Sequence, residues 1–293
     1  MQLAKSKKSL SPEYNVYMVD LHIANACNLS CDGCNHWSNY GFKEKFSYDT
    51  IKSWITPWKH KLLPERFNIL GGEPLLNKDA ERIIYLCKDS FPSAKHKFYT
   101  NALLLKNHVS WLYKALKDND ASLVITLHSR DKRYLKLFKK NLRCLSDWGD
   151  FVLKKETWFR KLYDVNGVEV EVRDMKSHWY KTYTGNGFNA KPYADNNPKK
   201  SWEECVSKES IQLYYGTLYK CGPIAYLKDF LGKYALSSDT AWKPYSTYQP
   251  LKHTCSDDDL SNFLSQEEEF ICNMCPANPK RVEDKEIFVK YEH

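Results

Sequence analysis

The sequence predicts an α/β fold built around a parallel β-sheet. Short apolar segments alternate with stretches of helical periodicity over about the first 180 residues, and this alternation is typical of repeated strand–helix units. Polar or metal-ligating residues follow directly after four of the apolar segments. Because the carboxyl ends of parallel strands meet at one edge of a sheet, we expect these residues to share one rim.

The individual elements follow from apolar periodicity and from helix breakers. Strands are expected at 17–23, 67–70, 97–100, 123–127 and 168–172, and helices at 47–63, 79–88, 109–116 and 132–145. Ser47 is expected to cap the first helix, and Pro64 to follow its end. The stretch 184–200 is polar and rich in Gly, Asn and Pro, which predicts a boundary before a smaller C-terminal part.

Composition and charge narrow the class of protein. The chain has 293 residues, of which 42% are apolar, enough for one large domain or for a barrel with an appendage. Its net charge of +8 is compatible with a phosphate-bearing or nucleic-acid substrate, although such an excess is more often a solvated surface. Residues 1–8 are basic and no apolar segment follows them, as a secretory signal would require. Since no segment approaches the roughly 20 apolar residues of a membrane helix, we expect a cytoplasmic protein without membrane contact.

Ten cysteines without a secretory signal favour metal or redox chemistry over disulfides. Three of them, Cys27, Cys31 and Cys34, follow the first strand with the spacing C-x3-C-x2-C. Structural zinc needs four ligands, and only His36 is near enough in sequence to be the fourth. An iron–sulfur cluster held by three cysteines keeps one iron open for a substrate or cofactor. The spacing therefore favours a cluster, with zinc as the alternative.

The run Gly-Gly-Glu-Pro at 71–74 follows the second strand. With the three-cysteine motif, it resembles the radical S-adenosylmethionine (radical SAM) superfamily. The resemblance implies a partial (β/α)6 TIM-like barrel, with a [4Fe-4S] cluster on the three cysteines and SAM bound to its open iron. Cleavage of SAM then gives a 5′-deoxyadenosyl radical that removes a hydrogen atom from the substrate. The resemblance also implies an electron donor such as flavodoxin or ferredoxin.

The resemblance assigns further residues of the barrel rim to SAM. These cofactor-binding residues are Gly71, Gly72, Glu73, Pro74, Asn101, Thr126, His128 and Arg173. The glycines let backbone carbonyls approach the amino group of SAM closely. By resemblance, Asn101 matches a ribose-side position and Thr126 a carboxylate-side one, although each is also a common strand-end cap. Many members place an aromatic residue where this chain has Gly33, so cover for the adenine is expected from His36, Trp37 or Tyr40.

A second cysteine set lies in the C-terminal part. Cys205 is followed after ten residues by Gly216 and then, after four residues, by Cys221. This spacing resembles the SPASM/twitch appendages of radical SAM enzymes, in which Cys272 and Cys275 would complete an auxiliary [4Fe-4S] cluster. This arrangement resembles the single-cluster twitch form of an aminocyclitol dehydrogenase, and a zinc ribbon is the alternative. We therefore divide the chain into a barrel at 12–183 and an auxiliary cluster domain at 184–293.

Three cysteines are left over. Cys87 and Cys144 lie in apolar helical stretches and are expected to be inert core residues. Cys255 lies in a polar segment, and three roles are open to it: an alternative cluster ligand, a surface thiol, or a catalytic hydrogen-atom donor. A donor cysteine is what the resemblance to an aminoglycoside epimerase implies.

Several reactions are compatible with these motifs. The first is oxidation or epimerisation of a small polar, sugar- or cyclitol-like molecule, by an oxidoreductase or isomerase. The second is modification of a ribosomal peptide, although the first strand begins near Tyr17 and leaves little room for a leader-binding domain. The third is rearrangement of a modified nucleotide or DNA base, favoured only by the positive charge. The run at 71–74 argues against a zinc-dependent binding module. We expect a monomer that oxidises or epimerises a small polar substrate.

Overall fold

The computed structural model describes residues 13–174, 180–280 and 287–288. The strands are β1 (Tyr14–His22), β2 (Ser30–Cys31), β3 (Leu62–Leu70), β4 (Lys95–Thr100), β5 (Ser122–Leu127), β6 (Phe151–Glu156), β7 (Arg160–Val165), β8 (Val168–Asp174), β9 (Ser210–Tyr214), β10 (Thr217–Tyr219), β11 (Leu251–Lys252) and β12 (Ile287–Phe288). The helices are α1 (Tyr48–Ile55), α2 (Ala80–Ser90), α3 (Val109–Asp118), α4 (Lys132–Leu142), α5 (Pro198–Glu203), α6 (Gly222–Ala225), α7 (Leu227–Lys233), α8 (Lys243–Ser246) and α9 (Asp257–Ser265). The basic residues 1–8 lie outside the described residues.

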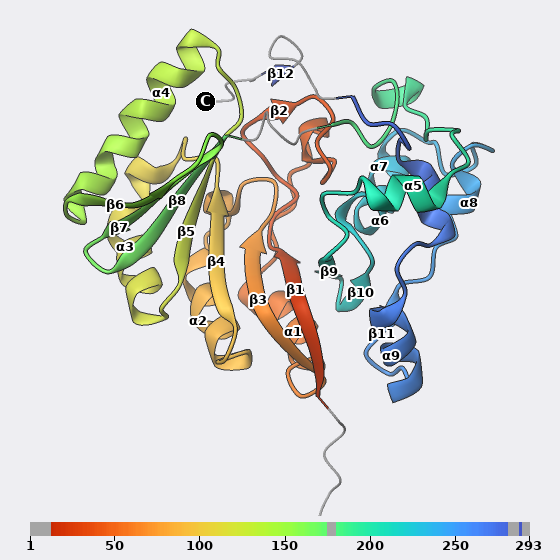
Figure 1. The fold of residues 1–293 in the computed structure, drawn as a ribbon, viewed down its shortest axis with the longest axis horizontal. Helices are drawn as coiled ribbons and strands as arrows, with labels where there is room; N and C mark the ends of the chain where they lie inside the picture. Colours follow the sequence, from red (N-terminus) through yellow and green to blue (C-terminus); the bar gives the residue numbers. More distant parts are fainter. Residues whose placement is uncertain (1–12, 175–179, 281–286, 289–293) are drawn as a thin grey trace, which may run out of the picture.

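One ten-stranded sheet runs through the protein in the order β11-β10-β9-β1-β3-β4-β5-β8-β7-β6. Its six central strands, from β9 to β8, pair in parallel. Figure 1 shows the elements from α5 to α9 beside β9–β11 and, on the far side of the sheet, the group β6–β8. The predicted α/β fold with a parallel sheet is thereby confirmed.

The start of the first helix agrees with the sequence, but its end does not. Ser47 caps α1, since its hydroxyl accepts a hydrogen bond from the amide of Thr50 at 3.2 Å. The helix ends at Ile55, because Pro57 lacks the amide hydrogen that would continue it. Pro64 ends no helix: it lies inside β3, opposite Val16 of β1, so the predicted end of this helix at Leu63 was wrong.

The sheet departs from simple strand–helix repetition after β5. Strands β6, β7 and β8 form an antiparallel meander, and only β8 pairs in parallel with β5. The sequence analysis did not predict β6 and β7. Five of the six residues of β6 are exposed, so its sequence lacks the apolar alternation that identifies a strand.

The C-terminal part shares the barrel's sheet. Strand β9 pairs in parallel with β1, and β10 and β11 extend the sheet beyond it. Trp37, which follows the three-cysteine loop, is fully buried between Tyr183 and Phe230, with ring centroids 4.2 and 4.1 Å away. Its indole donates a hydrogen bond to the carbonyl of Pro223 at 2.9 Å. The loop that carries the first cysteines is therefore held from the C-terminal side.

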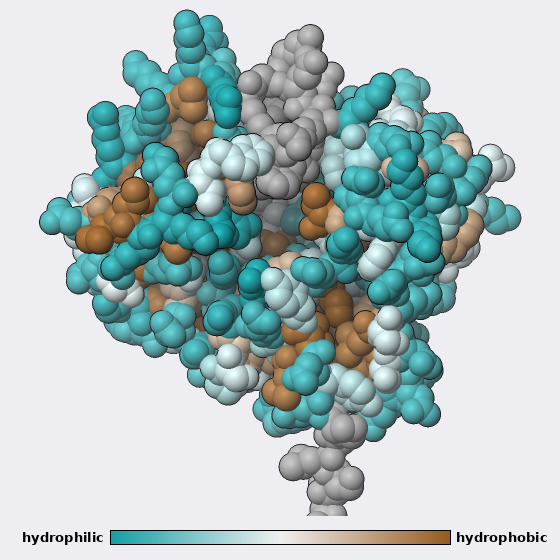
Figure 2. All heavy atoms as spheres, in the orientation of Figure 1, coloured by the Kyte–Doolittle hydropathy of each residue, from teal (hydrophilic) through white to brown (hydrophobic). Residues whose placement is uncertain are grey.

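The surface carries no single large apolar area on the face seen in Figure 2. Hydrophilic residues cover most of that face, and the hydrophobic residues visible there form separate groups. Trp158 has the most exposed large apolar side chain, at 73%. Across the described ranges, no helix combines the length and apolar character needed to cross a membrane.

Candidate cofactor and substrate site

A cavity of about 510 Å³ lies at the carboxyl ends of the parallel strands, a size in the range of small-molecule sites. Ten of the site residues expected from the sequence line it: Cys27, Cys31, Cys34, Gly71, Gly72, Pro74, Asn101, Thr126, His128 and Arg173. They come from the loop after β1 and from the ends of β3, β4, β5 and β8. The structure thus brings together residues that lie up to about 150 positions apart in the chain.

The three thiols of the first set are buried or half-buried. Burial raises the pKa of Cys27, Cys31 and Cys34 above the ordinary value of a thiol. Because water does not stabilise thiolates there, they need a bound cation to be deprotonated, and iron supplies such a charge. The Sγ of Cys31 also lies 3.8 Å from Nδ1 of His128. This donor set fits an iron–sulfur cluster.

Among the described residues, no three Cys, His, Asp or Glu side chains form a group that could hold a single metal ion.

The glycines at 71 and 72 let two backbone segments approach each other. A Cβ on Gly72 would lie 2.3 Å from the carbonyl oxygen of Ala26, and one on Gly71 would lie 2.6 Å from that of Ala24. The amide of Gly72 donates to the carbonyl of Ala24 at 2.6 Å. The glycines thus fix the end of β3 against the chain just before Cys27, while both still line the cavity.

Glu73 lies behind the cavity wall. Its side chain is fully buried, and it is absent from the described residues that line the cavity. The carboxylate accepts hydrogen bonds from the hydroxyl of Thr100 and the amide of Asn101, both at 2.8 Å. Burial raises the pKa of Glu73 to about 7. Its contacts join the ends of β3 and β4, so the carboxylate positions these two strand ends beside the cavity.

The three candidates for covering the adenine of SAM, His36, Trp37 and Tyr40, lie in different environments. His36 lines the cavity, and its Nδ1 lies 3.2 Å from the carbonyl oxygen of Gly71. Trp37 is in the core, as described above, and Tyr40 donates its hydroxyl to Tyr183 at 3.0 Å. Of the three residues, His36 is the one that faces the cavity.

The floor of the cavity is polar. Asp20 accepts hydrogen bonds from the amide nitrogens of Asn68 at 2.7 Å and of Gln212 at 2.8 Å, and from the hydroxyl of Ser210. These side chains are buried and come from the inward faces of β1, β3 and β9. The sequence analysis did not select them. A carboxylate inside an apolar strand was the available signal, because a buried charge needs partners.

A sequence profile of the radical SAM superfamily matches residues 21–143, which include both the three-cysteine motif and the run at 71–74. Residues 21–143 thus form a radical SAM domain. The family implies a [4Fe-4S] cluster and SAM, and the matched residues include Cys27, Cys31 and Cys34, which line the cavity.

One solved structure shares the fold over most of the chain. The structure of BtrN in complex with AdoMet and 2-DOIA gives a TM-score of 0.50 at 14% sequence identity, covering 92% of this chain and 95% of that chain. At that identity the likeness concerns the fold alone. Two further matches have lower scores. anSMEcpe with bound AdoMet and Cp18Cys peptide gives 0.32 at 18% identity over 44% and 41% of the chains, and SuiB of Streptococcus suis bound to S-adenosylmethionine gives 0.30 at 12% identity over 89% and 72%. No protein of curated function matches in sequence.

The second cysteine set lies beyond the matched radical SAM residues. Burial raises the pKa values of Cys205, Cys221, Cys272 and Cys275, and the charges of neighbouring thiols of the set raise those of the last three further. The segments that carry Cys205 and Cys275 contact each other, since the hydroxyl of Ser201 in α5 donates to the carbonyl of Cys275 at 3.0 Å. The segment after Cys205 lines the cavity through Val206 and Ser207. Cys205 therefore lies next to residues of the cavity wall.

Cys255 lies at the opposite end of the barrel. The Nζ of Lys61, just before β3, donates to the carbonyl of Cys255 at 3.3 Å. The hydroxyl of Tyr14, the first residue of β1, donates to the carbonyl of Asp257 at 3.1 Å. Cys255 is not among the described residues that line the cavity. A strand of nine residues is about 30 Å long, so the structure does not support a catalytic role for Cys255.

Proposed function

We propose that the protein is a radical SAM enzyme that oxidises a small polar molecule, and that its second cysteine set holds an auxiliary [4Fe-4S] cluster. The observation that carries the proposal is the shared cavity: the first thiols line it, the segment after Cys205 lines it, and the polar floor around Asp20 lies below. A bound cluster would supply an electron for cleavage of SAM to a 5′-deoxyadenosyl radical.

The residues of this chain would act by binding and positioning. Cys27, Cys31 and Cys34 would hold the first cluster, while Gly71 and Gly72 would present backbone groups to SAM. The floor residues would bind substrate hydroxyl or amino groups, because a carboxylate and two side-chain amides offer both acceptors and donors. Burial of these groups favours a polar substrate over an apolar one.

Oxidation is favoured over epimerisation by the position of the thiols. Oxidation takes one hydrogen atom, one electron and one proton from the substrate, and the second cysteine set could hold the electron acceptor beside the cavity. Epimerisation would need a hydrogen-atom donor at the substrate. Among the described residues that line the cavity, the thiols are those of Cys27, Cys31 and Cys34, all assigned to the cluster.

Product analysis tests the proposal. The protein is reconstituted anaerobically, its iron is counted, and dithionite and SAM are added together with pools of sugars, cyclitols, peptides and nucleosides. We expect about eight irons per chain, 5′-deoxyadenosine, and a product that lacks two hydrogen atoms. One deuterium from heavy water in the product would mean epimerisation, and an unchanged composition without solvent deuterium would mean rearrangement. A zinc-only protein that forms no 5′-deoxyadenosine would contradict the whole proposal.

A further inference from the structure

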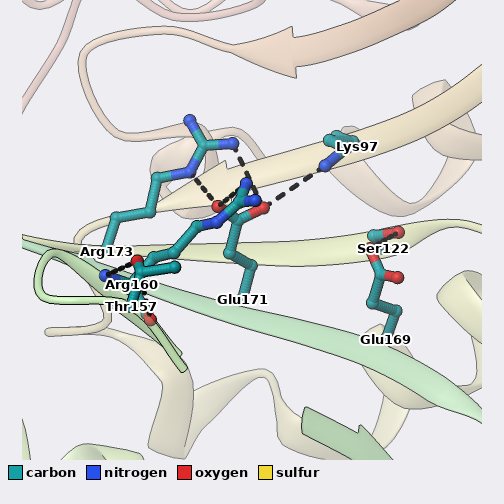
Figure 3. A network of polar contacts seen from close by, with 7 residues as sticks. All are labelled: Lys97, Ser122, Thr157, Arg160, Glu169, Glu171 and Arg173. Carbon is teal, nitrogen blue, oxygen red and sulfur yellow. Dashed lines mark hydrogen bonds and ion pairs between the residues drawn. The ribbon is translucent and has the colours of Figure 1, made fainter. Parts of the chain in front are cut away.

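Positive charge gathers around one carboxylate in the wall of the cavity. The side chain of Glu171 on β8 is 2% exposed and forms ion pairs with Arg173 at 2.5 Å, Lys97 at 3.3 Å and Arg160 at 3.7 Å. Figure 3 shows the three cationic side chains converging on this carboxylate from three strands. Three cations and one carboxylate leave an excess of two positive charges within this network.

The strand register makes this excess costly. Arg160 of β7 and Arg173 of β8 lie directly opposite each other, and like charges at such positions destabilise a sheet. The Nε of Arg160 is also buried without a hydrogen-bond partner among the described residues, and an unsatisfied buried donor carries a further cost. Both arginines and Glu171 line the cavity. Unfavourable features such as these facing arginines and this unpaired donor are expected where a bound ligand compensates for them.

We propose that this cationic wall, formed by Arg160 and Arg173, binds an anionic oxygen group of the substrate, either a carboxylate or a phosphate. The inference rests on the proposed function, because it specifies the substrate class for the same cavity. A planar guanidinium donates two parallel hydrogen bonds to such a group. The carboxylate of Glu171 accepts hydrogen bonds from Nε and from one terminal nitrogen of Arg173. Glu171 thereby fixes the guanidinium of Arg173 in the cavity wall without engaging its other terminal nitrogen.

The opposite side of the cavity has the complementary chemistry. Asp20 accepts hydrogen bonds there from neutral donors, and its own negative charge repels an anionic group. A substrate would thus place its anionic group on the cationic wall and its hydroxyl or amino groups near Asp20. This arrangement assigns Arg173 to the substrate rather than to SAM, and SAM is therefore the competing occupant in the test.

The test uses anion binding by the reconstituted protein with saturating SAM and no reductant. Thermal unfolding is followed as sodium phosphate or sodium acetate replaces sodium chloride at constant ionic strength. We expect a saturable rise in Tm with at least one of the two anions, and the effective anion distinguishes a phosphoryl from a carboxylate group. Arg160→Gln should weaken this binding by about tenfold or more, because a charged hydrogen-bond pair is lost. Arg160→Lys keeps the positive charge but lacks the two parallel donors of a guanidinium. Its anion affinity should therefore lie between those of the wild type and of Arg160→Gln.

Two further variants make the result specific. Lys161→Gln removes the same charge from the next residue of β7, where Lys161 is half exposed and pairs with Glu156, and it should leave anion binding unchanged. Glu171→Gln should lower Tm without anion, because the cations lose their partner, and should tighten phosphate or acetate binding. A merely structural Glu171 would not tighten it.

Three outcomes would overturn the inference: no saturable effect of either anion, equal weakening by Lys161→Gln and Arg160→Gln, or binding that occurs without SAM and disappears when SAM is added. The last outcome would mean that the cationic wall binds SAM and not the substrate. None of these measurements involves SAM cleavage, so their failure is distinguishable from failure of the proposed oxidation.

Discussion

The two cysteine sets differ in how the chain assembles them. Cys27, Cys31 and Cys34 belong to one loop after β1, whereas the second set comes from three segments between 205 and 275. The first set is local in sequence, and the glycines at 71 and 72 hold the chain before it. The second set needs long-range contacts, such as the hydrogen bond from Ser201 in α5 to the carbonyl of Cys275 at 3.0 Å. A ligand set can therefore be local in sequence or a product of the fold.

The sets also differ in access. All three thiols of the first set line the cavity, but the second set reaches it through Val206 and Ser207. Near the second set, Lys220 forms an ion pair with Glu269 at 3.7 Å, and burial raises the pKa of that glutamate. Thiols that line the cavity suit a cluster that binds SAM. Thiols that do not line it suit a cluster that only transfers electrons.

The largest effect is expected from the first set. Changing Cys27, Cys31 and Cys34 to Ala should abolish 5′-deoxyadenosine formation, because no cluster can then bind next to the SAM site. The variant should keep about four irons on the second set. Iron analysis and chromatography of the nucleoside product measure both quantities. Residual SAM cleavage above background would show that these cysteines do not hold the reacting cluster.

The contact between the loop of the first cysteine set and the C-terminal part can be broken at Trp37. Its truncation to Ala should lower the free energy of unfolding by about 3–5 kcal/mol, because a fully buried indole is lost. Trp158→Ala is the matched control, since this indole is 73% exposed, and its effect should stay within about 0.5 kcal/mol. Urea unfolding of the iron-free protein compares the two. Similar effects of both variants would mean that Trp37 does not join the regions.

The local support of the first set can be tested at Gly72. Gly72→Ala should destabilise the protein by about 1–3 kcal/mol and lower the iron content of the first set, because the new methyl group meets a carbonyl oxygen at 2.3 Å. Gly232 in α7 has no neighbour within 4 Å of its added Cβ, so Gly232→Ala should stabilise by up to about 1 kcal/mol. The claim fails if Gly72→Ala keeps the full iron content and stability.

Cys255 should give the smallest effect. Because it lies at the amino ends of β1 and β3, Cys255→Ser should change neither the iron content nor the product, and stability should shift by at most about 0.5 kcal/mol. Mass spectrometry of the product in heavy water provides the measurement. Accumulation of 5′-deoxyadenosine without product would restore the donor role and favour epimerisation.

The first site could be predicted because its ligands are contiguous and because parallel strands end at one rim. The partners of Asp20 in the polar floor could not be predicted, since a strand such as β9 alternates Ser210, Ile211, Gln212 and Leu213, and its polar face looks like a solvent face. In the structure Ser210 and Gln212 are buried. Arg160 was missed for a related reason, because the meander of β6 and β7 lacks the apolar alternation of a buried strand.

The central claim is that the two cysteine sets hold separate clusters with separate roles. It is tested most directly by Cys272→Ala with Cys275→Ala, measured for iron content and for 5′-deoxyadenosine under dithionite reduction. We predict a loss of about four irons with SAM cleavage largely retained and oxidised product absent. Loss of SAM cleavage as complete as in the triple variant of the first set, in a protein whose circular dichroism is unchanged, would contradict the claim.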